Sequence, residues 1–418
     1  MRLLDLPLKL VYAILTESVS VFGIRKAVEL RLVCKLFDAE VQRTIFEHPM
    51  FELTKQVDAD LPATMGPIFT ARLILTKLKS QDAGRRSLCK TITEALNVLE
   101  TVVEDFSSKR QRYTESLAIA AARKLQFIDV IECLSPDPEA TAEQSSPSRP
   151  FSLMRTYKRP CLDMTLTNGL SNALIAAISI QDTAAITALQ EAGGDILRDT
   201  VAFGHPIQAA AANGLTHLTR EMISKDITRS VQTRNLALSA AARAGQQDLI
   251  TLILDDPTLF PFGCIDFNTP ILYALQYGHE TLALLLLRYR NTMVLELGET
   301  RLCPNSFYMR REALRWFNFI SNGVRYKRYI FVQNAMEHFP NLPDMWVALF
   351  TQAVRKNSVQ VVEALLANTP SHIATSIASE ESRTALKIAV EGTNLEMMDL
   401  LAKSVRFNKS NEYIGDVI

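Results

Sequence analysis

The chain has 418 residues, of which 48% are hydrophobic, and it carries 45 basic and 45 acidic residues, so its formal net charge is zero. This length exceeds what one compact core holds, so we expect several domains or an elongated repeat. The zero net charge argues against a general electrostatic attraction to nucleic acid or to an anionic membrane. The six cysteines are widely spaced and never form a Cys-x-x-Cys pair. That spacing excludes a zinc ribbon and favours reduced intracellular thiols.

The N-terminal stretch MRLLDLPLKLVYAIL is apolar, but Asp5, Pro7 and Lys9 interrupt it and no cleavage-like site follows. We therefore do not expect a signal peptide. Elsewhere, no uninterrupted apolar run reaches the ~20 residues that a membrane helix needs. The expected location is intracellular, in the cytoplasm, the nucleus or both, without a membrane segment.

Residues 1–50 carry the landmarks of a small helical module. The dipeptide LP at 6–7 is followed by IL at 14–15 and by LRLVCKLFDAEV at 30–41. This order resembles the F-box, whose pattern runs Leu-Pro, then Ile-Leu, then L-R-x-V-C-[KR]-x-[WF]. The resemblance implies a three-helix unit that docks onto the adaptor subunit of a cullin-RING (SCF-type) ubiquitin ligase. The residues to which it assigns partner binding are Leu6, Pro7, Ile14, Leu15, Leu30, Val33, Cys34 and Phe37.

Residues 51–112 contain helical patterns, among them ARLILTKLK and CKTITEALNVLETVVEDF. We expect this segment to be a helical linker or capping region.

The segment TPILYALQYGHETLALLLL, residues 269–287, has the pattern of two short helices joined by a tight turn. Thr269 can cap the first helix, and Pro270 suits its first turn. Gly278 can adopt the left-handed conformation that costs another residue ~1–2 kcal/mol. The same frame recurs along the chain, and it predicts turns at positions 181, 214, 245, 278, 357 and 393. The first four positions are spaced by 33, 31 and 33 residues.

This recurring frame resembles the ankyrin repeat, whose consensus T-P-L-H-x-A-x-x-x-G-H-x-x-V-V-x-L-L-L residues 269–287 follow. The resemblance implies a solenoid in which each helix pair buries its apolar face against its neighbours. In that family the concave face and the loop tips bind other proteins. We expect the array to cover residues 113–410, with a degenerate opening repeat at 116–134, a Pro/Ser-rich loop near 135–150 and a divergent repeat within 300–340.

A basic and aromatic segment lies between Arg301 and Phe331, where seven basic residues accompany one acid. Arginine mixed with aromatic residues is typical of interface hot spots, and such mixtures also bind single-stranded nucleic acid. The alternative is that the aromatic residues form the core of the divergent repeat while the arginines are solvated. The predicted partner patch consists of Arg310, Arg311, Arg315, Trp316, Arg325 and Arg328.

The sequence contains no recognisable catalytic motif. It has no His-Glu-x-x-His, no Gly-rich phosphate loop and no Gly-x-Ser-x-Gly, and we expect His279 to form a structural hydrogen bond rather than to bind a metal. We therefore predict no enzyme activity, no catalytic or metal-binding residue and no cofactor.

These patterns together predict an all-α protein, an ankyrin-repeat solenoid of helix-turn-helix units preceded by a small F-box-like helical module. Its expected partners are proteins, namely the ubiquitin-ligase adaptor subunit and an unknown client, rather than nucleic acid or membrane. The hypothesis is a substrate-recognition adaptor of a ubiquitin ligase. The alternative is a non-enzymatic ankyrin scaffold in which the N-terminal helices only cap the solenoid.

Overall fold

The computed structural model of the chain is predominantly helical over the residues that it describes. These residues are 9–14, 17, 66–80, 86–125, 127–134, 168–226, 230–256, 266–298, 306–336, 343–367, 380–392 and 394–403. Within them every named element is an α-helix, and the single β-bridge, between Thr200 and Gly204, is isolated. The all-α expectation is confirmed for this part of the chain.

The chain divides into two compact units, unit 1 at Met1–Ala209 and unit 2 at Ala210–Ile418. The short helix α10 (Pro206–Ala212) spans the boundary between them. Among the described helices, none has the length and apolar character needed to cross a membrane.

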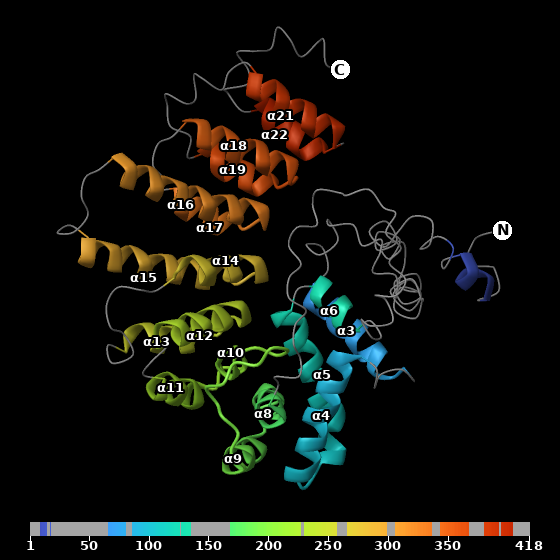
Figure 1. The fold of residues 1–418 in the computed structure, drawn as a ribbon. Helices are drawn as coiled ribbons and strands as arrows, with labels where there is room; N and C mark the ends of the chain where they lie inside the picture. The colour runs from blue at the N-terminus through green and yellow to red at the C-terminus, as the bar shows by residue number, and fades with distance from the viewer. Residues whose placement is uncertain are drawn as a thin grey trace, which may run out of the picture. The chain divides into compact units, whose positions relative to one another are not determined.

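Unit 1 is built around two long helices, α4 and α5. Helix α4 buries Leu88, Ile92, Ala95 and Leu99, which recur every three or four residues and so form one apolar face. Helix α5 packs against α3, α4 and α8, while α4 also contacts α6 and α8. The helices of this unit (Figure 1) are α3 (Pro67–Leu78), α4 (Ser87–Val102), α5 (Phe106–Lys124), α6 (Phe127–Leu134), α8 (Gly169–Ser179) and α9 (Thr183–Glu191).

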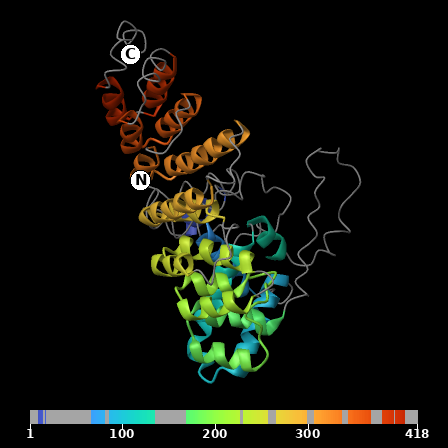
Figure 2. The same ribbon diagram turned by 90° about the vertical axis from the view of Figure 1, so that its left-hand side faces the viewer.

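Unit 2 is a stack of helix pairs, as Figures 1 and 2 show. Its helices are α11 (Thr216–Lys225), α12 (Ser230–Ala244), α13 (Gln247–Asp255), α14 (Asn268–Tyr277), α15 (Glu280–Gly298), α16 (Ser306–Arg325), α17 (Tyr329–Met336), α18 (Pro343–Arg355), α19 (Val359–Ala367), α21 (Glu380–Glu391) and α22 (Leu395–Lys403). The first helices of successive pairs pack on one another, in the order α12, α14, α16, α18 and α21. The second helices do the same, in the order α15, α17, α19 and α22. Each pair therefore buries its apolar side chains against the next pair.

The segment at 300–340, where the sequence predicts a divergent repeat, holds the pair α16–α17. This pair stands in the stack between α14–α15 and α18–α19, with which it shares contacts on both sides. The degenerate opening repeat expected at 116–134 coincides with the end of α5 and with α6. Their connection begins with Leu125 at φ −89°, so Leu125 is not left-handed.

Candidate interaction surface

One turn geometry joins the two helices of each pair, and α14–α15 shows it most simply. Gly278 has φ 91°, in the left-handed region. Its N–H donates to the carbonyl oxygen of Leu275 at 3.3 Å, and the N–H of His279 donates to that of Ala274 at 2.8 Å. These bonds satisfy carbonyls that the end of a helix would otherwise leave without a partner.

The same turn recurs along the chain. The other residues in the left-handed conformation at these turns are Gln181 (φ 61°), Gly214 (φ 67°), Gly245 (φ 76°), Lys327 (φ 59°) and Asn357 (φ 53°). In each case the following N–H donates to the carbonyl five residues earlier. The predicted turns at 181, 214, 245, 278 and 357 are therefore confirmed. Thr393 lies outside the described residues, although Asn394 makes the equivalent bond to Ala389 at 3.2 Å.

The turn at Lys327 was missed in the sequence, where the divergent repeat was placed without a turn residue. Lys327 lies 49 residues after Gly278 and 30 before Asn357, so regular spacing does not point to it. Lysine is also not among the residues that favour the left-handed conformation, which are glycine, asparagine and aspartate.

At the turns within the helix pairs, the residue that accepts the five-residue bond is small. These residues, all buried in the first helix of a pair, are Ala177, Ala210, Ala241, Ala274, Gly323, Ala353 and Ala389. Gly323 is the exception to alanine, and its neighbours explain it. A Cβ atom there would lie 2.9 Å from Val332 and 3.0 Å from Phe331 on α17. Two large side chains of the second helix therefore occupy the space that the methyl group of an alanine at this position would need.

The start of α14 differs from the sequence prediction. Thr269 was expected to cap this helix, but the helix begins at Asn268 and Thr269 lies inside its first turn. The Thr269 hydroxyl donates instead to Asp266 at 2.5 Å, and Asp266 also accepts the N–H of Asn268 at 2.9 Å. The carboxylate before the helix therefore performs the role that the sequence pattern gave to Thr269, while Pro270 lies in the first turn as expected.

At three turns of unit 2, the side chain after the left-handed residue reaches back to the preceding helix pair. The three such bonds in unit 2 join Gln246 Nε2 to the Ala212 oxygen at 3.1 Å, His279 Nε2 to the Arg243 oxygen at 3.2 Å, and Arg328 Nε to the Leu275 oxygen at 2.9 Å. An amide, an imidazole and a guanidinium thus satisfy the same kind of helix-end carbonyl. The structural hydrogen bond expected of His279 is confirmed.

In unit 1, Asp182 is the residue that follows a left-handed residue, Gln181. Its carboxylate accepts hydrogen bonds from Lys109 Nζ at 2.7 Å, from the Tyr113 hydroxyl at 2.8 Å and from the backbone N–H of Ala185 at 3.2 Å. Partial burial raises the pKa of Asp182, but these three hydrogen bonds outweigh it and hold the pKa below its usual value. Burial, followed by the bond to Asp182, raises the pKa of Tyr113. Asp182 therefore stays ionised and ties α9 to α5.

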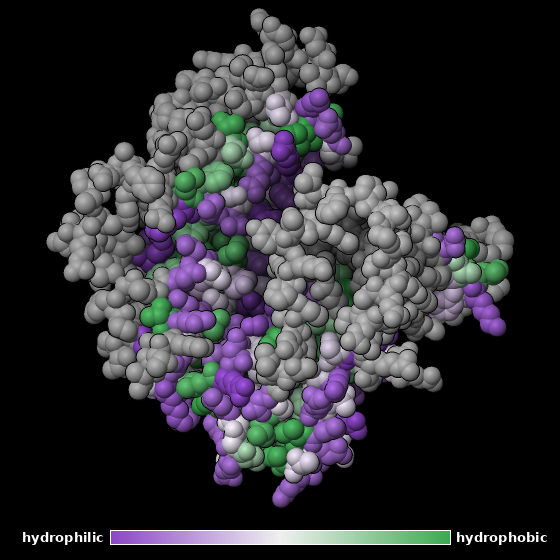
Figure 3. Space-filling view, in the orientation of Figure 1, coloured by the Kyte–Doolittle hydropathy of each residue, from purple (hydrophilic) through white to green (hydrophobic). Residues whose placement is uncertain are grey.

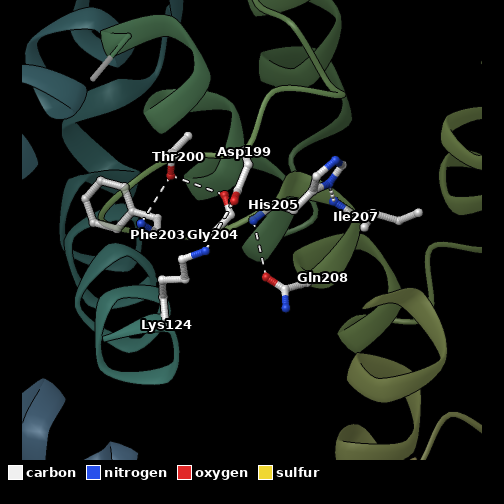
Figure 4. Close-up of polar contacts among 8 residues, drawn as sticks. All are labelled: Lys124, Asp199, Thr200, Phe203, Gly204, His205, Ile207 and Gln208. Carbon is white, nitrogen blue, oxygen red and sulfur yellow. Dashed lines mark hydrogen bonds and ion pairs between the residues drawn. The ribbon is translucent and has the colours of Figure 1, made fainter. Parts of the chain in front are cut away.

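A short loop precedes α10, and Figure 4 shows its contacts. Thr200 and Gly204 form the isolated bridge, and the Thr200 hydroxyl donates to the Gly204 oxygen at 3.2 Å and accepts from the Phe203 N–H at 3.1 Å. At the base of the loop, Asp199 forms an ion pair with Lys124 of α5 at 3.3 Å. The bridge closes the loop, and the ion pair ties it to α5.

His205 caps α10 in the manner of a capping box. Its Nδ1 accepts the N–H of Ile207 at 3.1 Å, while the Gln208 side-chain oxygen accepts the N–H of His205 at 3.2 Å (Figure 4). Serine or threonine usually holds the first of these roles. An imidazole can replace it only while Nδ1 is unprotonated.

Two neighbouring turns of unit 2 gather positive charge, and we call them the basic turn edge. Its residues are Arg325, Lys327, Arg328, Arg355 and Lys356. All except Arg328, which is half-buried, are exposed. The two turns are adjacent, because α16 packs on α18, α17 packs on α19, and Lys327 Nζ lies 3.5 Å from the Asn357 oxygen. None of these cations is ion-paired with another described residue.

The residues of the predicted partner patch lie in different surroundings. Trp316 is buried, meets Phe319 edge-on at 6.2 Å between ring centroids, and lies 5.8 Å from the Arg290 guanidinium. It thus belongs to the core of its helix pair, while Arg315 is half-buried. Arg325 and Arg328 lie at the basic turn edge. Arg310 and Arg311 belong to α16, and their side chains lie outside the described part.

Of the F-box-like residues, only Ile14 lies in the described part of the chain. Residues 9–14 are helical, with Ile14 40% exposed and Val11 2% exposed. One side of this helix is therefore buried, and another side is open to solvent. The predicted residues outside the described part are Leu6, Pro7, Leu15, Leu30, Val33, Cys34 and Phe37.

The groups that could react or bind a metal are side chains of histidine, cysteine, aspartate and glutamate. No three of these side chains in the described part of the chain gather as a metal site would require. Cys89 is a buried free thiol, and burial raises its pKa to about 11, against the opposing effect of Arg86 and Lys77. The thiol is therefore protonated at neutral pH, which makes it a weak nucleophile.

The fold and its turns define an all-α protein with stacked helix pairs. No family model matches the chain, and no curated protein matches its sequence. On the face that Figure 3 shows, the described residues are mainly hydrophilic, and the hydrophobic ones lie in separate groups.

Proposed function

We propose that this chain is a substrate-recognition adaptor of an SCF-type ubiquitin ligase. In this proposal the N-terminal F-box-like module binds the ligase's adaptor subunit, and the helix pairs, as ankyrin repeats, bind the client protein. The chain itself makes or breaks no covalent bond, and it acts by holding the client near the ligase.

The observation that carries the ankyrin part of the proposal is the recurrent turn. A left-handed residue, a five-residue hydrogen bond and a small residue at the acceptor position occur together from Gln181 to Asn357. A left-handed residue and a five-residue bond are common at helix ends. Their recurrence together with a small acceptor residue in successive helix pairs supports units stacked in one register, in which each pair approaches the next in the same way. The capped loop before α10 also suits an array that presents loop tips to a partner.

The module part of the proposal is supported by the sequence order LP, IL and LRLVCKLF at 6–7, 14–15 and 30–37. The 40% exposure of Ile14 supports it further, because a docking helix presents apolar side chains to solvent.

The experiment is a binding assay between the purified full-length chain and the purified adaptor subunit of the ligase. We expect the wild-type chain to retain the subunit and Leu6→Asp/Val33→Asp to retain at least tenfold less. The matched control is Ile68→Asp/Leu395→Asp, because both residues are largely exposed, at 72% and 79%, and lie outside the module. Circular dichroism verifies that each variant is folded. Equal retention by both double variants, or none by the wild type, contradicts the proposal.

The buried side of the N-terminal helix favours a second candidate, the ankyrin scaffold whose N-terminal helices only cap the array. Val11 is 2% exposed, so this helix packs within the chain. Under this candidate, Leu6→Asp/Val33→Asp lowers the thermal midpoint of the whole chain, and no ligase subunit binds to the wild type.

A further inference from the structure

We propose that the basic turn edge binds an acidic segment of a partner protein, through the side chains of Arg325, Lys327, Arg355 and Lys356. The inference rests on the proposed role of the helix pairs as the client-binding part, and it names the chemistry of the client at one place on that array. The segment that fits is rich in aspartate and glutamate.

The first argument is the absence of counter-charges. Cations in the last turn of a helix are stabilised by the helix dipole, which accounts for Arg325 and Arg355. Lys327 and Lys356 lie beyond those helix ends, so the dipole accounts for them less well. Like charges that lie close together repel one another. The described residues supply no ion pair to offset that repulsion, whereas an acidic ligand would.

Of the carboxylates near these turns, Glu280 and Glu363 belong to second helices, while Glu391 and Glu396 flank the next turn, which Asn394 joins to Asn357. None of these four forms an ion pair with the edge among the described residues. Glu280, at the start of α15, accepts the backbone N–H of Phe331 at 2.6 Å. Glu363 lies in α19, in the turn of helix that follows the first one. The two turns themselves, residues 325–328 and 355–358, contain no acid.

The second argument is the backbone of Lys327. It has φ 59°, a conformation that costs any residue other than glycine, and three other turns of unit 2 have glycine at this position. The Lys327 side chain is exposed, forms no ion pair among the described residues, and makes one long hydrogen bond, to the Asn357 oxygen at 3.5 Å, which is too weak to account for the choice of lysine. Strained backbone that local packing does not explain is found preferentially at ligand-binding positions.

The size of the edge favours a protein segment over nucleic acid. Packed helices lie about 8–10 Å apart. Two adjacent turns therefore match about three residues of an extended chain, at roughly 3.3 Å each. Nucleic-acid sites commonly engage some 6–10 phosphates, which needs a longer track of cations and a basic chain. This chain has no net charge.

Apolar surface lies next to the cations. Tyr329 and Ile330, at the start of α17, are 39% and 40% exposed. An aromatic residue beside arginines is typical of the central contacts of protein interfaces. An acidic segment that also carries an apolar residue could therefore use both parts of the edge.

The test uses the purified full-length chain without any ligase component, so that its outcome is independent of the proposed docking to the ligase. The probe is a fluorescein-labelled peptide of about ten alternating aspartate and glutamate residues, and fluorescence anisotropy reports its binding at low and at physiological salt. We expect saturable binding that weakens with salt, and at least a tenfold weaker affinity for Arg355→Glu/Lys356→Glu.

The control is Arg288→Glu/Lys387→Glu, which changes the net charge equally at exposed sites on α15 and α21. It is expected to alter the affinity less than twofold. Where the charge reversal impairs folding, Arg355→Gln/Lys356→Gln replaces it, with an expected threefold loss. Equal weakening by the control, or absence of saturable binding, overturns the proposal. Tighter binding of an oligodeoxythymidylate than of the peptide also overturns it, and assigns the edge to nucleic acid.

Discussion

The pairs α14–α15 and α16–α17 make the same turn with opposite residue choices. In α14–α15 the buried acceptor is Ala274 and the left-handed residue is Gly278. In α16–α17 the acceptor is Gly323 and the left-handed residue is Lys327. The glycine has moved by four residues, from the turn to the contact between the helices.

The difference shows that two separate demands act on each pair. One is conformational, since the turn requires a positive φ. The other is steric, since the second helix must fit against the first. Phe331 and Val332 make the steric demand severe in α16–α17, where the Cβ of an alanine would lie about 3 Å from both. The turn of that pair has a lysine, Lys327, at φ 59°, a conformation that is strained for residues other than glycine.

The largest expected effect comes from filling the contact in the divergent pair. Gly323→Val places a branched side chain against Val332 and Phe331, and overpacking of this kind costs about 1–3 kcal/mol or more. We expect the free energy of unfolding, measured by urea denaturation, to fall by about 3 kcal/mol. Ala348→Val, at an exposed site on α18, is the control and should change it by under ~0.5 kcal/mol. A loss no greater than that of the control would show that the contact is loose.

Gly278→Ala probes the conformational demand in the regular pair. A Cβ there would lie 3.2 Å from Arg328 Nη2, the mobile end of a long side chain, so the backbone conformation is the main cost. We expect a loss of about 1–2 kcal/mol in the same denaturation experiment. An unchanged denaturation midpoint would falsify the assignment of a left-handed turn to this position.

The smallest effect has the opposite sign. Lys327→Gly removes the strain of a non-glycine residue at φ 59° and should stabilise the chain by about 0.5–1 kcal/mol. The same variant removes one cation of the basic turn edge, so we expect weaker binding of the acidic peptide together with higher stability. Lower stability would mean that the lysine side chain itself stabilises the turn.

The sequence predicted the helix pairs and most of their turns, because glycine or asparagine and a regular spacing mark them. Gln181 was predicted from the recurring frame of the repeat, although glutamine is not a residue that favours the left-handed conformation. Lys327 was missed, because neither residue type nor spacing marks it. The cap of α14 was assigned to Thr269, three residues beyond the carboxylate that binds the helix start, Asp266. The helix begins at Asn268, one residue before Thr269, and helix ends often shift by one or two residues.

The basic turn edge was only partly foreseen. Arg325 and Arg328 were included in the predicted patch, but Arg355 and Lys356 lie 30 residues further along and join them only through the stacking of the pairs. The bonds made by Gln246, His279 and Arg328 were beyond prediction as a set, because three unrelated side chains share one role. Position in the fold, rather than residue type, defines that role.

The central claim is that one chain carries separate surfaces for a ligase and for a client. Quantitative mass spectrometry of proteins copurified with the tagged full-length chain tests it most directly, by comparing the wild type, Leu6→Asp/Val33→Asp and Arg355→Glu/Lys356→Glu. We predict that the first variant loses the ligase subunits and keeps the other partners, and that the second keeps the ligase subunits and loses an acidic partner. Absence of ligase subunits from the wild-type sample, or loss of the same proteins by both variants, would contradict the claim.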